Sequence, residues 1–326
     1  MKYELLERLR CPKTGQRLTL DTPEPITNII VNGWLVSMDG QHRYPIRNGI
    51  PRFVPEENYA DNFGMQWNHF SQTQLDSYSG HPISSNRFWK ATGWRPEDLK
   101  GQWVLDVGCG AGRFAEIALN SGANVVALDY SSAVDACYAN LKHHPNLHIV
   151  QGDIYALPFE QESFPFVYSL GVLQHTPDVA KAFAALPPLV ARGGRLCVDY
   201  YQKSWKSILH LKYWLRPVTK RLPKPVLFSI LQTVVPILLP VSRLLGGMPV
   251  LGGGLKRLIP VVNYYGILAL NHTQQKEWSL LDTFDWLSPA YDHPQTATTA
   301  REWMERAGMH SVEVMKAGHL VARGYK

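Results

Sequence analysis

Residues 103–114 read WVLDVGCGAGRF, a short apolar run followed by an acid and three glycines in steps of two: Asp106, Gly108, Gly110 and Gly112. Such a turn after a strand lets the backbone approach a ligand at the carboxyl end of the strand, where a Cβ would collide. A dinucleotide turn needs glycine at position 113, which is Arg113 here, and Asp106 would repel a pyrophosphate bound at the following helix. The turn therefore favours a ligand with a cationic or amino group; the alternative is a tight turn without a ligand.

The segments after this turn alternate between strand-like and helix-like patterns as far as residue 201. The alternation predicts a parallel sheet with crossover helices. Residues 296–326 resume the pattern with a helix and two strands that meet at Gly318. We therefore expect an α/β core domain built from residues 101–201 and 296–326.

Acidic residues also mark the ends of the second and third predicted strands. Asp129 ends the run NVVALDY, where its two carboxylate oxygens can accept hydrogen bonds from both hydroxyls of a ribose. Asp153, in QGDIYALPF, can accept a hydrogen bond from an adenine amine, with Tyr130 and Ile154 as apolar walls for the ring. Acids at three successive strand ends are more specific than glycines alone, and they predict a ligand that contains a nucleoside.

With these motifs the sequence resembles the class I S-adenosylmethionine-dependent methyltransferases, over about residues 100–201 and 296–326. VLDVGCGAG is similar to the first motif of that family, LDYS to its second-strand acid, GDIYALPF to its adenine-side motif and GGRLCVDYY to its fifth strand. The resemblance implies a Rossmann-like sheet of seven mostly parallel strands with an antiparallel last strand. It also implies S-adenosylmethionine as the cofactor.

The resemblance further implies where the parts of the cofactor lie. Asp106, Gly108 and Gly110 would lie along its methionine part, Asp129 on the ribose and Asp153 on the adenine. Further pocket residues are expected to be Gly112, Tyr130, Ile154 and Gln174. Arg87, in the segment before the first strand, is expected to meet the methionine carboxylate; the alternative is a surface arginine on an amphipathic helix.

Methyl transfer from a sulfonium is an in-line displacement, so alignment and the exclusion of water supply most of the rate. A base is needed only when the acceptor loses a proton, as a hydroxyl does. His175, in LGVLQHTPD after the fourth strand, is expected near the reactive methyl; the alternative is that Gln174 and His175 only wall the pocket. Asp199 at the end of the fifth strand and His293 before the last helix are the other catalytic candidates.

Residues 1–56 hold short strand-like runs between turn signals and predict a small β module. The module resembles the small zinc-ribbon-like domains of tRNA-methyltransferase activator proteins. Only Cys11 of the first C-P-x-C knuckle is present, Thr14 stands at the partner position, and His42 alone cannot complete four ligands, so we expect no metal. Residues 57–100 are expected to form a helical segment that covers the cofactor.

Residues 202–295 form a long insertion that is both basic and apolar. Between Tyr200 and Glu277 there is no Asp or Glu, whereas eleven Lys or Arg occur. The chain as a whole has a formal net charge of +6, and the remainder outside this stretch holds 22 basic against 27 acidic residues. The stretch therefore predicts a surface for anionic partners.

Residues 225–242 of the insertion carry no charge, a length that barely reaches a spanning helix. Pro236 and Pro240 argue against a simple transmembrane span. Three readings remain open: a helical lid that rests on an anionic membrane or admits a lipophilic acceptor, a buried helical subdomain, and a true span. Within the lid reading, the basic surface at 203–257 would contact the membrane.

These observations predict a methyltransferase that acts on a small or lipid-linked acceptor, more at oxygen than at carbon or nitrogen. An RNA methyltransferase is the second hypothesis, because the basic stretch can hold phosphates, although it lacks interleaved stacking aromatics. A cofactor-binding scaffold without activity is the third. The charged, amphipathic first residues and four scattered cysteines predict a cytoplasmic protein, peripheral at the inner membrane face in the lid reading.

Overall fold

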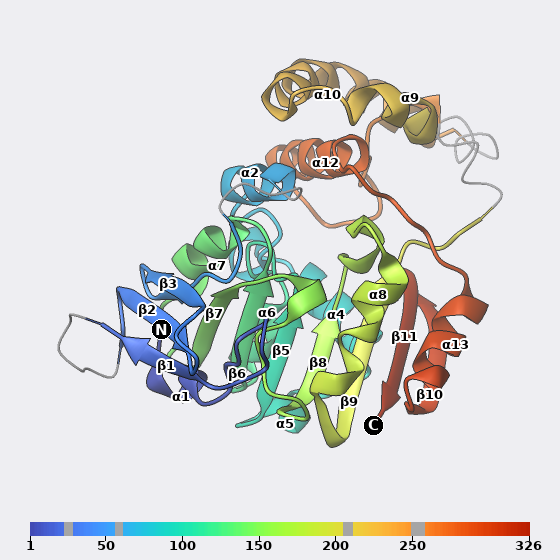
Figure 1. Cartoon of the computed structure of the whole chain (residues 1–326). Helices are drawn as coiled ribbons and strands as arrows, with labels where there is room; N and C mark the ends of the chain where they lie inside the picture. Colours follow the sequence, from blue (N-terminus) through green and yellow to red (C-terminus); the bar gives the residue numbers. More distant parts are fainter. Residues whose placement is uncertain (23–28, 56–60, 205–210, 249–257) are drawn as a thin grey trace.

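The structure is a computed structural model, and it describes residues 1–22, 29–55, 61–204, 211–248 and 258–326. Its main sheet has seven strands in the order β10-β11-β9-β8-β5-β6-β7 (Figure 1). The strands are β5 (Trp103–Val107), β6 (Asn124–Asp129), β7 (Leu147–Gln151), β8 (Phe164–Ser169), β9 (Val190–Tyr200), β10 (His310–Ala317) and β11 (His319–Tyr325). Strands β5 to β9 pair in parallel, and β11 is antiparallel to both of its neighbours. The predicted Rossmann-like sheet with an antiparallel last strand is confirmed.

The sheet is buried on both faces because successive side chains of a strand point to opposite sides. Val104 and Leu105 of β5 illustrate this, since they belong to two different hydrophobic clusters. The cluster around Val104 includes α4 (Ile83–Thr92), α6 (Ala115–Asn120) and α7 (Ala133–Leu141). The cluster around Leu105 includes α8 (Val179–Ala184) and α13 (Ala297–Arg306). The result is a three-layer core, with short helices α3 (Asp76–Ser79) and α5 (Pro96–Leu99) at its periphery.

The N-terminal residues form a separate antiparallel sheet of β1 (Leu18–Asp21), β2 (Gly33–Ser37), β3 (Arg43–Arg47) and β4 (Ile50–Pro51), with α1 (Tyr3–Leu6) beside it. Leu5, Leu9 and Ile46 of this module share the Leu105 cluster, so the module packs on the core. The thiol of Cys11 lies 3.3 Å from the hydroxyl of Tyr44. Among the described residues no group of three or more His, Cys, Asp or Glu side chains is placed to hold a metal ion. The resemblance of the module to a zinc ribbon stays a prediction.

Three helices in the described part of the insertion, with α2 (Asp61–His69), lie over the carboxyl ends of the sheet strands (Figure 1). They are α9 (Leu211–Thr219), α10 (Lys224–Gly246) and α12 (His272–Leu287). Helix α10 runs unbroken through Pro236 and Pro240. Of the helices described, α10 alone is long and apolar enough to cross a membrane by length and composition. We call α9, α10 and α12 the lid helices.

Candidate functional site

One cavity of about 930 Å³ lies between the carboxyl ends of the strands and the lid helices. One part of its wall comes from turns that follow the strands and includes Gly108, Gly110, Asp129, Tyr130, Ile154 and Val172; we call it the loop half. The other part comes from the end of β9 and from the insertion and includes Tyr201, Lys212, Tyr264, Trp278, Asp282 and Trp286; we call it the lid half. Since both halves belong to one continuous space, two molecules bound in them would meet.

The glycines of the loop half are required by their surroundings. Gly108 has φ +87°, and a Cβ on it would lie 2.3 Å from a methyl of Val172. Gly110 has φ +52° and faces Trp67, while the amides of Gly108 and Cys109 both donate to the carbonyl of Leu128. The turn is thus folded back on β6, and its bare backbone lines the cavity. Gly112 is not among the lining residues: its open side faces Leu141 and Cys137, so its role here is packing.

Asp129 lies at the tip of β6 with its carboxylate oriented by three donors. One oxygen accepts from the amide and hydroxyl of Ser131, at 2.9 and 2.7 Å, and the other accepts from the amide of Gly110 at 2.9 Å. Burial raises the pKa of this carboxyl above its ordinary value, although the hydrogen bonds oppose the shift. The oxygen that accepts from Gly110 keeps a second lone pair, so the carboxylate can still accept a hydrogen bond from a hydroxyl in the cavity.

Asp106 lies deeper, in β5, and is not among the residues that line the cavity. Its side chain is buried, and one carboxylate oxygen has no hydrogen-bond partner among the described residues. Burial raises the pKa of Asp106 to about 8. Burial thus favours the protonated form of this carboxyl, and the predicted contact of Asp106 with the ligand stays a prediction.

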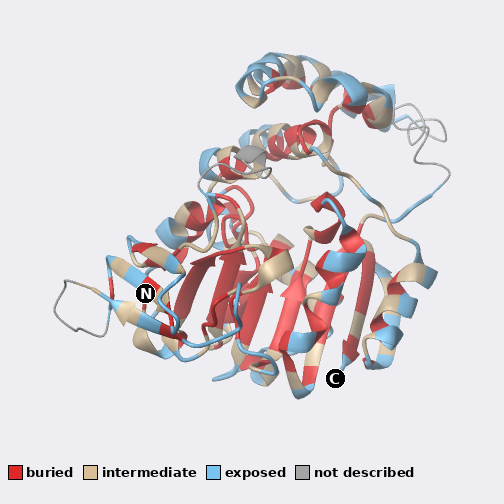
Figure 2. Ribbon diagram, in the orientation of Figure 1, coloured by how far each residue is buried: buried red, intermediate tan, exposed pale blue. Residues whose placement is uncertain are grey.

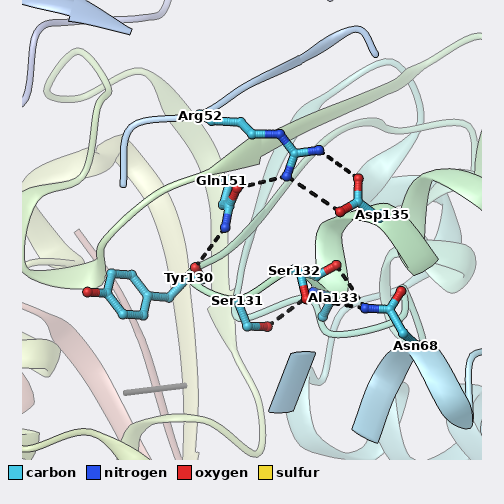
Figure 3. Close-up of polar contacts among 8 residues, drawn as sticks. All are labelled: Arg52, Asn68, Tyr130, Ser131, Ser132, Ala133, Asp135 and Gln151. Atoms are coloured by element: carbon cyan, nitrogen blue, oxygen red, sulfur yellow. Dashed lines mark hydrogen bonds and ion pairs between the residues drawn. The ribbon is translucent and has the colours of Figure 1, made fainter. Parts of the chain in front are cut away.

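The loop after β6 is held from the N-terminal module (Figure 3). Arg52 donates to the side chain of Gln151 at 2.8 Å and pairs with Asp135 of α7 at 2.6 Å. Gln151 in turn donates to the carbonyl of Tyr130 at 3.2 Å. Tyr130 lines the cavity, so a residue of the small β module orients a wall of the loop half.

Of the three residues predicted at the adenine, the structure places two, Tyr130 and Ile154, in the cavity wall. Ile154 lines the cavity, whereas Asp153 is not among the lining residues. The carboxylate of Asp153 accepts from the amide of Tyr155 at 2.9 Å and caps the short 3-10 turn there. The backbone amide of the turn thus competes with a ligand for this carboxylate, as is common for Asp residues that precede a helical turn.

His175 lies in the turn after β8 and lines the cavity where the two halves meet. Its Nδ1 lies 3.1 Å from the carbonyl of Tyr291, and a carbonyl only accepts, so Nδ1 carries the proton. The buried Nε2 has no partner among the described residues and keeps its lone pair. The rings of Phe63 and Tyr201, with centroids 5.4 and 5.3 Å away, fix the plane of the imidazole. This arrangement leaves Nε2 as the ring nitrogen without a partner among the described residues.

The neighbours predicted beside His175 lie elsewhere. Gln174 is fully buried and is not among the lining residues, so it supports the pocket from behind. His293 is exposed and also absent from the wall; its backbone amide donates to the carbonyl of Gln174 at 2.9 Å. The structure therefore favours His175 over His293 as the group that meets a substrate.

Asp199 belongs to a buried ion pair. Its side chain is 1% exposed, lies 2.8 Å from the guanidinium of Arg87 and 3.3 Å from Nδ1 of His319, and accepts from the amide of Gly171. Burial raises the pKa of Asp199, but Arg87 and His319 outweigh it and hold the pKa below its ordinary range. A carboxylate so strongly ionised is a poor base, so the geometry favours a structural role. Arg87 does line the cavity, already paired with this acid.

The lid half contains polar residues that the sequence did not single out. Asp282 of α12 accepts from the hydroxyl of Tyr264 and from the amide of Gln74 at 3.3 Å, and burial raises its pKa to about 6. Gln74 also accepts from Arg113 at 2.9 Å, so a hydrogen-bond chain joins the glycine turn to the lid. Helical spacing offers a signal for α12, since Trp278, Asp282, Asp285 and Trp286 lie on one face and all line the cavity.

With this geometry established, the comparisons with known proteins define a class for the core. Residues 105–198 match the family model described as a methyltransferase domain. The core of the chain is therefore a methyltransferase domain, and the predicted resemblance is confirmed for this segment.

Two curated relatives are both described as ubiquinone biosynthesis O-methyltransferases. A ubiquinone biosynthesis O-methyltransferase of Coxiella burnetii is 30% identical over 128 residues, which are 39% of this chain and 55% of the relative. Another, of Albidiferax ferrireducens, is 35% identical over 115 residues, which are 34% of this chain and 46% of the relative. The chain spans about half the length of the curated relatives it matches.

Among solved structures, one similar chain is a phosphoethanolamine N-methyltransferase of Haemonchus contortus in complex with S-adenosyl-L-methionine. It is 15% identical, with a TM-score of 0.45, over 84% of this chain and 48% of that one.

Proposed function

We propose that this protein is an S-adenosylmethionine-dependent methyltransferase that transfers a methyl group to an oxygen atom of a small or lipid-linked acceptor. The observation that carries the proposal is the single cavity that joins the glycine turn and Asp129 to His175 and the lid half. The methyltransferase-domain match at 105–198 and the relatives described as O-methyltransferases support the same reaction.

The residues of the loop half fit this cofactor. The bare backbone at Gly108 and Gly110 would hold the methionine part, Asp129 the ribose hydroxyls, and Tyr130 with Ile154 the adenine. A Cβ at Gly108 would collide with Val172, so the backbone there stays bare, and the preoriented carboxylate of Asp129 can accept from a ribose hydroxyl. When bound, the cofactor supplies an electrophilic methyl group on a positively charged sulfur.

The other steps fall to the side chains of the chain itself. The lid half would hold the acceptor and, with the lid helices above it, exclude water from the reaction. His175 would take the hydroxyl proton at Nε2, while the carbonyl of Tyr291 stabilises the resulting imidazolium through Nδ1. A base at this position favours an oxygen acceptor, since methylation of a neutral amine can proceed without one.

The two other hypotheses receive less support. In an RNA methyltransferase the lid half would meet phosphates, but it carries Asp282 and Asp285, which repel them. A scaffold without activity would not need a histidine with an unpartnered ring nitrogen in the cavity wall. A cytoplasmic location stays a prediction; the four cysteines are free thiols, as that location requires.

Calorimetry with S-adenosylhomocysteine tests the cofactor site. We expect the wild-type protein to bind it, and Asp129→Ala to bind at least about tenfold more weakly because charge-assisted hydrogen bonding to the ribose is lost. Asp21→Ala, which removes an exposed carboxylate from the N-terminal module, is the matched control and should bind like the wild type. Equal affinity in wild type and Asp129→Ala contradicts the proposal.

The acceptor is tested separately by transfer of a labelled methyl group to three pools: total RNA, a lipid extract, and small catechols. The proposal predicts label in the lipid extract or the catechols. Label in RNA alone supports the RNA hypothesis, and cofactor binding with no label in any pool supports the scaffold.

A further inference from the structure

Helix α9 buries its charged side chains and exposes apolar ones. Lys212 and Arg216 are buried and lie 3.5 and 3.8 Å from the carboxylate of Asp292. On the opposite side, Trp214 is 70% exposed and Val218 is 63% exposed, one helical turn apart. A helix that faces water normally shows the reverse arrangement. The outward face of α9 is therefore suited to an apolar environment.

Helix α10 continues this surface because it is apolar on two sides. Its inner side, with Leu227, Leu231, Val235 and Leu239, packs in a cluster that includes Phe284 and Leu287 of α12. Its outer side exposes five apolar residues at helical spacing: Val226, Ile230, Ile237, Val241 and Leu244. Figure 2 shows α9 and α10 at the edge of the molecule, far from the core sheet, with much of α10 coloured as exposed. We call the exposed apolar residues of α9 and α10 the outer face.

The exposed charged side chains that the structure describes on α9, α10 and the segment between them are all basic. Lys220 and Arg221 are exposed in the segment between α9 and α10, and Arg243 is exposed in the last turn of α10. No Asp or Glu occurs anywhere between Tyr200 and Glu277. An apolar strip that ends in bases at both sides is complementary to a surface with an apolar interior and anionic headgroups.

We propose that the outer face docks on an anionic lipid bilayer, with α9 and α10 lying in the plane of the headgroups. The exposed side chains, Trp214 above all, would enter the headgroup and acyl boundary, and the bases would meet lipid phosphates. The proposal goes beyond the methyl transfer itself, because it concerns the side of the lid that faces away from the cavity.

Two other occupants fit less well. A second copy of the chain would bring the same bases against one another, with no acid within the stretch to neutralise them. A spanning α10 would have to leave α12 and expose the cluster around Phe284 and Leu287 to water. Docking on the surface of a bilayer neither brings these bases against one another nor separates α10 from α12.

Co-sedimentation of the full chain with vesicles tests the proposal. The vesicles contain either phosphatidylcholine alone or equal parts of phosphatidylcholine and phosphatidylglycerol. We expect the wild type to sediment with the anionic vesicles at least tenfold more than with the neutral ones, and to be released by salt. The double variant Ile237→Glu with Leu244→Glu should lose at least tenfold in partitioning. Lys220→Glu with Arg221→Glu should lose the preference for anionic lipid.

Met38→Glu is the matched control, since Met38 is 64% exposed on the N-terminal module, and it should sediment like the wild type. S-adenosylhomocysteine binding, measured on the same variants, should stay unchanged, so failure of the docking surface and failure of the cofactor site are separable. No binding of the wild type to anionic vesicles overturns the proposal. A wild-type dimer in the absence of lipid that the double variant Ile237→Glu with Leu244→Glu dissociates would also overturn it, because the occupant would then be a second copy. Protein that carbonate cannot extract from native membranes would overturn it as well, because α10 would then span the bilayer.

Discussion

The two halves of the cavity are built in different ways. The loop half consists of backbone turns and of acids fixed by neighbouring amides, as Asp129 is fixed by Gly110 and Ser131. The lid half consists of side chains from an insertion, such as Tyr264 and Asp282, that hydrogen-bond to one another. The first half can recognise one cofactor with little change in sequence, because backbone geometry does most of the recognition. The second half can change its acceptor by changing side chains, so specificity is expected there.

The largest effect is expected from Gly108→Val in the loop half. The new Cβ would lie 2.3 Å from Val172 at φ +87°, so the turn must move by more than the cofactor site tolerates. We expect cofactor affinity to fall by about 10²-fold or more in calorimetry. Gly193→Val is the control. Its φ is +73° and nothing lies within 4 Å of an added Cβ, so this variant has the backbone strain of Gly108→Val without the collision. Similar losses of affinity in both variants would mean that strain, and not the cavity, explains the effect.

His175→Asn tests the junction of the two halves. Asn can still donate to the carbonyl of Tyr291, but it has no group at the position of Nε2. We expect kcat to fall by about 10²–10³-fold, with cofactor affinity within about twofold of the wild type. Steady-state kinetics with the acceptor found above, together with calorimetry, measure both. A kcat that is unchanged would leave His175 as a wall of the cavity only.

Asp199→Asn should act on stability more than on chemistry. It breaks the buried pair with Arg87, and we expect the free energy of unfolding at pH 7 to fall by about 2–4 kcal/mol. Because the folded pKa of Asp199 lies below the unfolded value of about 4, the wild type gains this stability above about pH 4 and loses it as the pH falls further. Urea unfolding at pH 7 and pH 3 should show the difference between the two proteins shrinking. A large loss of kcat at unchanged stability would instead return Asp199 to a catalytic role.

The smallest effect is expected from Arg52→Gln, which loosens the loop half from outside. It removes the contacts to Gln151 and Asp135 that hold Tyr130 (Figure 3). We expect cofactor affinity to fall by about threefold to tenfold, which corresponds to about 1 kcal/mol. Arg43→Gln breaks an exposed pair with Asp21 in the same module and should change affinity by less than about twofold. Equal behaviour of the two variants would show that the module does not orient the loop.

The structure brings residues that the sequence singled out, such as Gly108 and Asp129, into one cavity wall, and the sequence could indicate them because their signals are local. The strand before Gly108 and the acid at position 129 can each be recognised from a window of about a dozen residues. The sequence did not show that the carboxylate of Asp153 caps the adjacent turn, because this competition depends on rotamer and not on spacing. The place of Asp153 at the adenine stays a prediction. Asp199 looked catalytic at a strand end, but its partner Arg87 lies 112 residues earlier in the chain.

The residues of the lid half could not be predicted from local sequence patterns, for a physical reason. Its side chains converge from β9, α9, α12 and the segment before α12, and no fixed spacing links them. The net charge of the insertion was visible, but the arrangement of α9, with Lys212 inside and Trp214 outside, was not. Only the packing of α9 against Asp292 determines which side faces outward.

The central claim is that one cavity holds the methyl donor in its loop half and leaves the lid half for the acceptor. A crystal structure with S-adenosylhomocysteine tests it most directly. The account predicts the ribose hydroxyls on Asp129, the adenine against Tyr130 and Ile154, and the sulfur facing His175 across an open lid half. A nucleoside bound among Tyr264, Trp278 and Asp282 instead, or a bound ligand whose sulfur faces away from His175, would contradict it.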